Sequence, residues 1–349
     1  ASDVYKRQVP GTLVVATEGF DRFIRENNLK DIGAAVDNDH EIENRFLNAR
    51  LPANLADTLT AYLEKVTGPL SVRSSGLFED AYFQPYSGLY KTYMVPNNDP
   101  EFDVRREQLF TAVKLVYAST FFKSPLTFKK STRYHIRRDA MALMIQQLAG
   151  TVWGDYFYPA VSGVACSKNY YPVAGMQSDE GIVRIALGMG KTVDEGAGGL
   201  RFSPRHPEIL PQFSRLEDIL ENAQYRFYAL KVKGYEKKLG FHRGTNLEIR
   251  DISDAEDEYP VKSLCSTYIP AENRIRDSRV KNGSPVLTFA SVLKYDRFPL
   301  AELTTDLLKL GRAGMGCDVE FEFCLNLNPQ SGEPDEFYIL QVRPMTAGQ

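Results

Sequence analysis

The most constraining feature of the sequence is a pair of alternating segments near its C-terminal end. Residues 318–325 and 337–343 each alternate polar and apolar side chains, and a segment rich in Asn, Pro and Gly separates them. Successive side chains of a strand point to opposite faces, so this pattern predicts two antiparallel strands joined as a hairpin. The acidic residues of the first strand would share one face: Asp318, Glu320 and Glu322.

The polar face of this predicted hairpin has the chemistry of a magnesium and phosphate site. Gln341 and Arg343 alternate in phase on the second strand. Carboxylate and amide oxygens are ligands that Mg²⁺ accepts alongside phosphate oxygens, and a guanidinium binds phosphate with two hydrogen bonds. A salt-bridged, solvent-exposed sheet face is an equally good interpretation of the alternation alone.

A second polar block lies in the N-terminal half. Arg73 ends a strand-like run and is followed by Ser74 and Ser75, and Gly88 precedes another strand-like run. An arginine beside hydroxyl groups can contact phosphate, and glycine lets backbone N–H groups approach an anion. A simple turn between strands is the alternative.

Strand-like and helix-like patterns are mixed along the whole chain. Apolar or alternating runs predict strands at residues 13–16, 70–73, 90–95, 142–148, 160–167 and 182–187. Helical spacing predicts helices from residue 17, over 41–66 with a break at Pro52, and over 100–132, 215–233 and 303–310, the last ended by Gly311. We therefore expect an α/β (α+β) fold.

Composition excludes several classes of protein. The 349 residues are 43% hydrophobic and 25% charged, which rules out a disordered, collagen-like or coiled-coil chain. The net charge of −3 argues against a nucleic-acid-binding protein, and a basic cluster between residues 123 and 138 is better explained as a solvated helix face. No apolar segment is long enough to cross a membrane. The four cysteines lack CxxC spacing, so zinc is disfavoured and a cytoplasmic protein with reduced thiols is expected.

Two common phosphate-binding motifs are incomplete. Residues 190–192 are Gly-Lys-Thr, but a P-loop needs glycine where Ile185 stands. The GxGxxG pattern that starts at Gly188 fails because Val193 occupies its last glycine position. A plain turn is therefore the better interpretation around Lys191. None of the four histidines has a partner at metal-binding spacing.

The chain begins with residues that do not resemble ordinary protein sequence. Residues 1–8 are interpreted as a non-native N-terminal scar and are set aside from the fold prediction, so the chain is expected to be a fragment. Residues 9–140 are expected to form an N-terminal lobe with the phosphate-contacting loops. Residues 141–349 are expected to form a C-terminal lobe with an adenine hinge and the metal-binding hairpin.

A series of short blocks resembles a known family. The blocks are, in order, Val72-Arg73-Ser74-Ser75 with Glu79-Asp80, Ser87-Gly88 with Thr92, Ile145-Gln146-Gln147-Leu148, Ser162-Gly163-Val164, Leu187-Gly188 with Gly190, Asp318 with Glu320, and Tyr338 to Pro344. In this order they resemble the N-terminal ATP-binding domain of the phosphoenolpyruvate synthase and pyruvate phosphate dikinase family. That domain has an ATP-grasp fold, in which two lobes enclose a nucleotide cleft. The resemblance runs from Val9 to Thr346 and is weak over residues 215–300.

The resemblance implies roles for the matching residues. Those implied to contact ATP are Arg73, Gly88, Thr92 and Arg343 at the phosphates, and Gln146, Gln147 and Leu148 at adenine. Those implied to bind Mg²⁺ are Glu320 and Gln341, supported by Asp318. Arg73 and Arg343 would be the catalytic residues, because phosphoryl transfer depends mainly on positioning and charge neutralisation.

The resemblance also implies an activity. ATP, pyruvate and water would give AMP, phosphoenolpyruvate and phosphate through a phosphohistidine, with the phosphohistidine and pyruvate-binding domains following Gln349. A lysine that binds phosphate in the family would lie upstream of Val9, and Lys191 stands where relatives often carry Glu. The alternatives are an ATP-grasp enzyme with another acceptor, such as phosphate, an antibiotic or a glucan, and a non-catalytic nucleotide-binding module.

Overall fold

The structure is a computed structural model that describes residues 5–36, 38–76, 90–123, 141–173, 175–194, 199–240, 246–278, 280, 283–329 and 333–345. The chain forms two compact units that are interleaved in the sequence. The hairpin unit comprises Ala1–Pro10, Ala149–Leu230 and Glu248–Ala347. The helical unit consists mainly of Gly11–Leu148 and Lys231–Leu247. Both units combine helices with strands, so the predicted mixed α/β class is confirmed.

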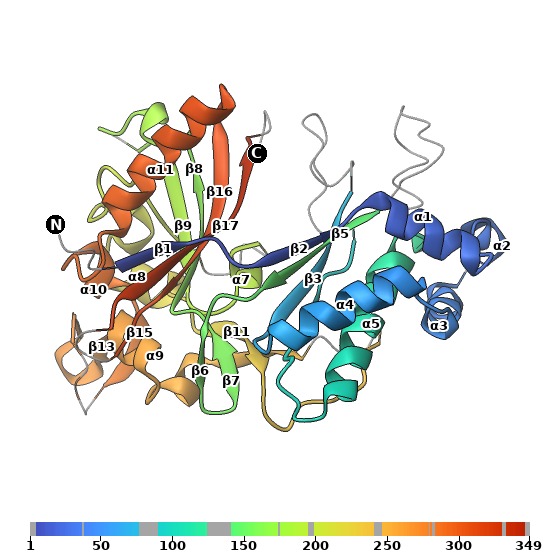
Figure 1. Cartoon of the computed structure of the whole chain (residues 1–349). Coiled ribbons are helices and arrows are strands. Elements are labelled where there is room, and N and C mark those ends of the chain that lie inside the picture. The colour runs from blue at the N-terminus through green and yellow to red at the C-terminus, as the bar shows by residue number, and fades with distance from the viewer. Residues whose placement is uncertain are drawn as a thin grey trace. The chain divides into compact units, whose positions relative to one another are not determined.

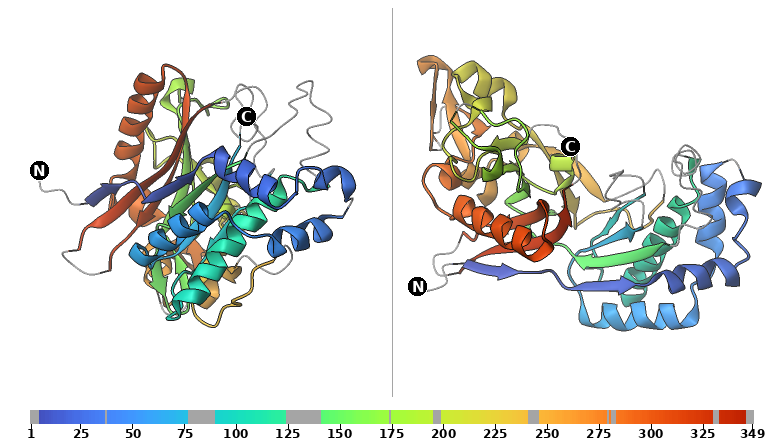
Figure 2. Two further views of the ribbon diagram at one scale, coloured as in Figure 1. Left: turned by 45° about the vertical axis from the view of Figure 1, so that its right-hand side comes forward. Right: turned by 90° about the horizontal axis from the view of Figure 1, so that it is seen from above.

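The helical unit packs helices against one four-stranded sheet. Its strands run in the order β2-β5-β3-β4, namely β2 (Thr12–Val15), β5 (Ala142–Gln147), β3 (Leu70–Ser75) and β4 (Tyr93–Val95). Its helices are α1 (Thr17–Glu26), α2 (Ile32–Ala35), α3 (Asp39–Asn48), α4 (Ala53–Lys65) and α5 (Phe102–Ser119). Helices α4 and α5 lie side by side along the sheet (Figure 2). The sequence analysis assigned residues 141–349, and so β5, to the C-terminal lobe. In the structure β5 pairs with β2 and β3 of the helical unit.

The two faces of this sheet differ in polarity. Val72, Leu143 and Ile145 point to the helices and are fully buried among residues of α1, α3, α4 and α5. The other face carries Arg73 and Gln146, which alternate with these core residues. Because a strand has a side-chain period of two, the apolar sequence pattern that forms the core also places both polar residues on the face away from the helices.

The hairpin unit is built on a six-stranded sheet. Its order is β1-β17-β16-β8-β9-β10, with β1 (Tyr5–Gln8), β17 (Asp335–Pro344), β16 (Val319–Asn326), β8 (Val161–Cys166), β9 (Ile182–Ala186) and β10 (Leu200–Phe202). Strand β1 runs parallel to β17 at the sheet edge, as the dark blue and red arrows of Figure 1 show. The other neighbouring pairs are antiparallel. Helix α11 (Leu300–Met315) packs against β16.

Smaller elements complete the hairpin unit. A second sheet has the order β12-β11-β7-β6 and contains β12 (Leu247–Asp251), β11 (Arg226–Lys231), β7 (Tyr156–Tyr158) and β6 (Thr151–Trp153). A third has the order β14-β13-β15 and contains β14 (Arg274–Arg276), β13 (Cys265–Ile269) and β15 (Ser284–Leu287). The helices here are α7 (Lys191–Asp194), α8 (Leu216–Asn222), α9 (Tyr259–Leu264) and α10 (Ala290–Leu293).

Candidate nucleotide site

The polar face of the hairpin is organised by two cross-strand pairs. Glu320 of β16 lies opposite Arg343 of β17, and Glu322 lies opposite Gln341. Directly opposite residues of antiparallel strands project to the same face, so these four side chains share one face, as the alternation predicted. The register shifts between Glu322 and Phe323, where Leu340 is the extra residue of a β-bulge.

Glu320 is a buried carboxylate whose charge is compensated. Its Oε1 accepts hydrogen bonds from Nε of Arg343 at 2.8 Å and from Nη2 at 2.5 Å. Its Oε2 accepts one from Sγ of Cys166 on β8 at 3.4 Å. Glu320 is only 9% exposed, so the alternative of a solvent-exposed salt bridge does not describe it. Burial, together with the Glu320 charge, raises the pKa of the Cys166 thiol to about 12, which keeps the thiol a hydrogen-bond donor.

Asp318 lies just before β16 and has partners of its own. Its Oδ1 accepts a hydrogen bond from Nε of Arg312 in α11 at 2.8 Å and one from Oγ of Ser167 at 3.0 Å. Burial alone would raise the pKa of Asp318, but these hydrogen bonds and the Arg312 charge outweigh it and lower that pKa. Through these hydrogen bonds, Asp318 links the start of β16 to α11 and to Ser167, which follows β8.

The donor set of the hairpin suits magnesium. Mg²⁺ in nucleotide sites usually takes one or two carboxylates and completes its shell with water and phosphate oxygens. Glu320 and Gln341 supply a carboxylate and an amide oxygen on one face of adjacent strands. Among the described residues, no group of three or more His, Cys, Asp or Glu side chains could hold a metal by itself. The hairpin thus fits a metal that binds together with phosphate, and these residues stay the predicted ligands.

The predicted phosphate contacts of the helical unit lie at one end of its sheet. Arg73 is half-buried on β3, opposite Met144 of β5. Val72, which precedes Arg73, pairs with Tyr93 of β4, and Thr92 directly precedes β4. Thr92 is exposed. Arg73 and Thr92 therefore lie at the same end of the sheet, whereas Gly88 lies outside the described residues.

The predicted adenine contacts differ in orientation. Gln146 pairs with Ser71 and shares a sheet face with Arg73. It is 6% exposed, and its Nε2 donates to Oγ1 of Thr12 at 3.2 Å. Gln147 points to the opposite face, since adjacent strand residues alternate. The N–H groups of Gln147 and Leu148 already donate to backbone carbonyls, at 2.9 and 2.8 Å. Of the two glutamine side chains, Gln146 is therefore the one that shares the Arg73 face.

Two blocks of the sequence pattern have structural roles in the hairpin unit. Gly163 of β8 lies under the ring of Phe323, and a Cβ built there would be 2.3 Å from a ring carbon. Gly188 has a φ of +88°, which favours glycine, and its carbonyl accepts a hydrogen bond from Oγ of Ser162 at 2.6 Å. The close packing of Gly163 on Phe323 and the hydrogen bond from Ser162 to Gly188 therefore stabilise the sheet that carries the polar face. The Nζ of Lys191 lies 4.5 Å from the centre of the Tyr228 ring.

Several contacts around the polar face were not predicted from the sequence. Cys166 and Ser167 lie on or just after β8, far from the hairpin in the sequence, and Arg312 lies on α11, the helix that directly precedes β16. Only the strand register brings Cys166 opposite Glu320. Of the basic cluster at residues 123–138, all but Lys123 lies outside the described residues.

Paired carboxylate, amide and guanidinium groups on one sheet face are suited to Mg²⁺ and phosphate, the chemistry that a nucleotide-binding domain needs. The family model described as pyruvate phosphate dikinase, AMP/ATP-binding domain, matches residues 5–349. The chain therefore belongs to this family, which confirms the resemblance and assigns an ATP/AMP-binding domain of ATP-dependent phosphotransferases. A search of curated proteins gave no match. Over the described residues, no helix has the length and apolarity needed to cross a membrane.

Proposed function

We propose that this chain binds ATP with Mg²⁺ and serves as the ATP-binding domain of a phosphoenolpyruvate synthase-like phosphotransferase. The observation that carries the proposal is the hairpin face, where Glu320 pairs with Arg343 and Glu322 with Gln341. Glu320 and Gln341 would hold Mg²⁺, which neutralises phosphate charge when it is bound. Arg343, now hydrogen-bonded to Glu320, would turn to the transferring phosphate.

Residues of the helical unit are also proposed to contact the nucleotide. Arg73 would neutralise phosphate charge, Thr92 would donate a hydrogen bond to phosphate, and Gln146 would contact adenine. The support is that Arg73 and Gln146 share a face of one sheet and that Thr92 directly precedes β4 of the same sheet. Gly88, Gln147, Leu148 and Asp318 remain proposed contacts or supporting residues on the strength of the family resemblance.

The proposed site is tested by titrating the chain with ATP in a calorimeter, with and without Mg²⁺. We expect Mg²⁺ to tighten binding and Glu320→Gln to abolish this gain while ATP alone still binds. The matched control is Glu333→Gln, an exposed carboxylate beside β17 in the same hairpin. Equal Mg²⁺-dependent binding by wild type and Glu320→Gln would contradict the proposal.

The acceptor is proposed to be a histidine outside these 349 residues, which then phosphorylates pyruvate. Of the four histidines, His40 and His206 are described, and each lies near a glutamate, Glu43 at 3.3 Å and Glu180 at 3.6 Å. Because the proposed acceptor lies outside the chain, incubation with MgATP should leave the mass of the chain unchanged. An acid-labile gain of a phosphate group would show instead that the acceptor lies within it.

A further inference from the structure

The carboxylate of Glu320 accepts hydrogen bonds from the strands on both of its sides. Arg343 of β17 donates to Oε1, from Nε at 2.8 Å and from Nη2 at 2.5 Å. Cys166 of β8 donates from Sγ to Oε2 at 3.4 Å. Both partners lie directly opposite Glu320 in the antiparallel register. Each oxygen of this carboxylate therefore has its own donor, a guanidinium on one side and a thiol on the other.

The end of β8 that carries Cys166 is hydrogen-bonded to β16 beside this contact. Cys166 is the last residue of β8, and Ser167 follows it. The N–H of Ser167 donates to the carbonyl of Val319 at 2.8 Å, and its Oγ accepts a hydrogen bond from the N–H of Val319 at 2.9 Å. Ser167 is only 1% exposed, so water does not compete for these bonds. The pairing of the two strands therefore determines where the thiol lies relative to Glu320.

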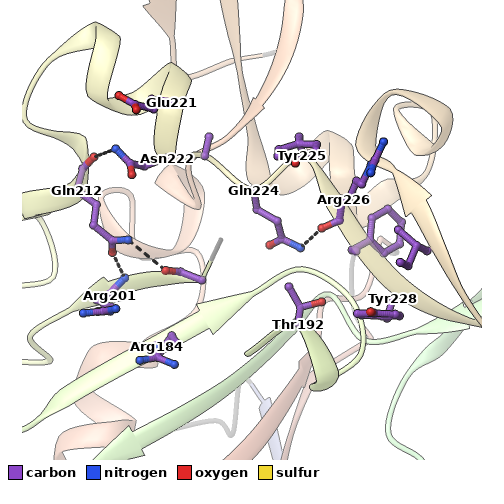
Figure 3. Close-up of a pocket in the computed structure, with 14 residues that line it drawn as sticks. Arg184, Thr192, Arg201, Gln212, Glu221, Asn222, Gln224, Tyr225, Arg226 and Tyr228 are labelled. Carbon is purple, nitrogen blue, oxygen red and sulfur yellow. Dashed lines mark hydrogen bonds between the residues drawn. The ribbon is translucent and has the colours of Figure 1, made fainter. Parts of the chain in front are cut away.

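A cavity of about 490 Å³ lies further along the same sheet, and Figure 3 shows Arg184 of β9 and Arg201 of β10 on its wall. Neither Cys166 nor Glu320 belongs to its lining. The Glu320 carboxylate is thus oriented by its two neighbouring strands, and not by a group on the wall of this cavity.

The two donors differ in what the proposed function requires of them. That function turns Arg343 toward phosphate, so Oε1 would lose both of its hydrogen bonds. The Cys166 thiol would then be the remaining donor to Glu320 among the described residues. Glu320 is only 9% exposed, so water replaces a lost donor poorly there. A thiol is neutral, and it leaves the negative charge of the carboxylate available to a cation.

We propose that Cys166 is a positioning residue, which holds the Glu320 carboxylate in place when Arg343 leaves it for phosphate. This role rests on the proposed function of the hairpin face, to which it adds the group that orients the carboxylate. Hydrogen-bond partners of metal ligands orient those ligands, and their loss typically lowers metal affinity roughly 10- to 100-fold. Because a thiol is a weak donor, we expect the lower end of that range for Cys166.

The test is the gain in ATP affinity that Mg²⁺ produces, measured by calorimetric titration with and without the metal. Cys166→Ala should reduce this gain about tenfold and leave the affinity for ATP alone as in wild type. Cys166→Ser restores a neutral donor at the same position. It should recover part of the gain, since its C–O bond is shorter than the C–S bond and the hydroxyl reaches Oε2 less well.

Cys265→Ala is the matched control. Cys265 is a buried cysteine at the start of β13, in a different sheet of the same unit. Its replacement removes a thiol from the hairpin unit at a distance from the polar face, so this variant should bind ATP as wild type in both conditions. Equal gains from Mg²⁺ in Cys166→Ala and wild type would overturn the proposal. An equal loss of affinity with and without Mg²⁺ would also overturn it, because that result indicates a merely structural role.

A spectroscopic measurement on the chain without nucleotide tests the contact itself. The S–H stretching band of Cys166 is the infrared band that disappears in Cys166→Ala. Glu320→Gln should shift this band to higher frequency, because an amide oxygen is a weaker acceptor than a carboxylate. An unchanged band would overturn the role of Cys166 and leave the proposed function standing. Absence of any Mg²⁺ gain in wild type would instead overturn the proposed function, and the role of Cys166 with it, so the two failures are distinguishable.

Discussion

Gly163 illustrates how one residue controls the packing behind the candidate site. The ring of Phe323 occupies the space that a side chain at this position would need. Gly163→Ala is therefore expected to destabilise the protein by roughly 1–3 kcal/mol through overpacking, measured as a lower denaturant midpoint. Gly314→Ala is the control, since nothing lies within 4 Å of a Cβ there and alanine favours the helix. A wild-type midpoint for Gly163→Ala would contradict this packing argument.

The contact between Asp318 and Arg312 gives a prediction for pH dependence. The pKa of Asp318 is lowered in the folded state, so this carboxylate stabilises the fold above its unfolded pKa of about 3.9. That contribution is lost as the pH falls through the lowered value. Arg312→Gln should therefore reduce the melting temperature at pH 7, and the difference from wild type should shrink below about pH 4. A difference that stays constant from pH 7 to pH 3 would exclude the role of this carboxylate.

The polar residues of the hairpin face could be predicted from the sequence, but their hydrogen-bond partners on other elements could not. The alternation placed Glu320, Gln341 and Arg343 on one face, which the register confirms. Cys166 and Arg312 could not be found in this way, because their contacts depend on how β8 and α11 pack against the hairpin. The register between two strands and the packing of a helix on a sheet depend on the tertiary structure. The alternation of side chains along one strand does not determine them.

At the scale of elements, β1 is the largest departure from the sequence analysis. Residues 1–8 were set aside, yet Tyr5–Gln8 pair with β17 along its start. Nε2 of Gln8 donates to Glu336 at 3.1 Å, and the ring of Tyr5 packs edge-on against Phe298 with centroids 4.9 Å apart. These residues also fall within the family match, which begins at residue 5. A polar, unusual composition did not prevent pairing at a sheet edge, because backbone groups make the bonds.

Truncation tests the contribution of β1. Removal of residues 1–8 should lower the melting temperature by a few degrees, or roughly 1 kcal/mol, relative to removal of residues 1–4 alone. Both variants lack residues 1–4, but only the longer deletion removes the strand pairing and the Gln8 and Tyr5 contacts. Identical melting temperatures for the two truncations would show that β1 adds no stability.

Two helix predictions were wrong in extent, for identifiable reasons. The helix predicted over 215–233 ends at Asn222, and β11 follows it. Nε2 of Gln224 donates to the carbonyls of Leu187 and Arg226, and Phe227 and Ala229 alternate inward, so tertiary contacts select a strand there. Helix α11 continues through Gly311, which packs on Val319, and ends at Gly316 with a φ of +68°. Short windows with helical spacing do not distinguish these outcomes.

At the scale of the whole molecule, the sequence order of short blocks was more informative than any single motif. The blocks identified the family, and the family match covers the chain from residue 5. The structure adds that the blocks divide between two interleaved units, with Arg73 and Gln146 in the helical unit and Glu320 and Arg343 in the hairpin unit. The two groups differ in chemistry, because the hairpin residues include a carboxylate that could hold a metal, whereas Arg73 is proposed to contact phosphate directly.

This difference predicts two distinct binding defects. Arg73→Gln removes a positive charge that would contact phosphate whether or not a metal is present, so ATP affinity should fall about tenfold, or ~1.4 kcal/mol, with and without Mg²⁺. Glu320→Gln should affect only the Mg²⁺-dependent part. Arg22→Gln, which removes an exposed arginine paired with Glu26 on α1 of the same unit, is the control and should bind ATP as wild type. If Arg73→Gln binds ATP normally in both conditions while keeping its melting temperature, Arg73 has no role at the phosphates.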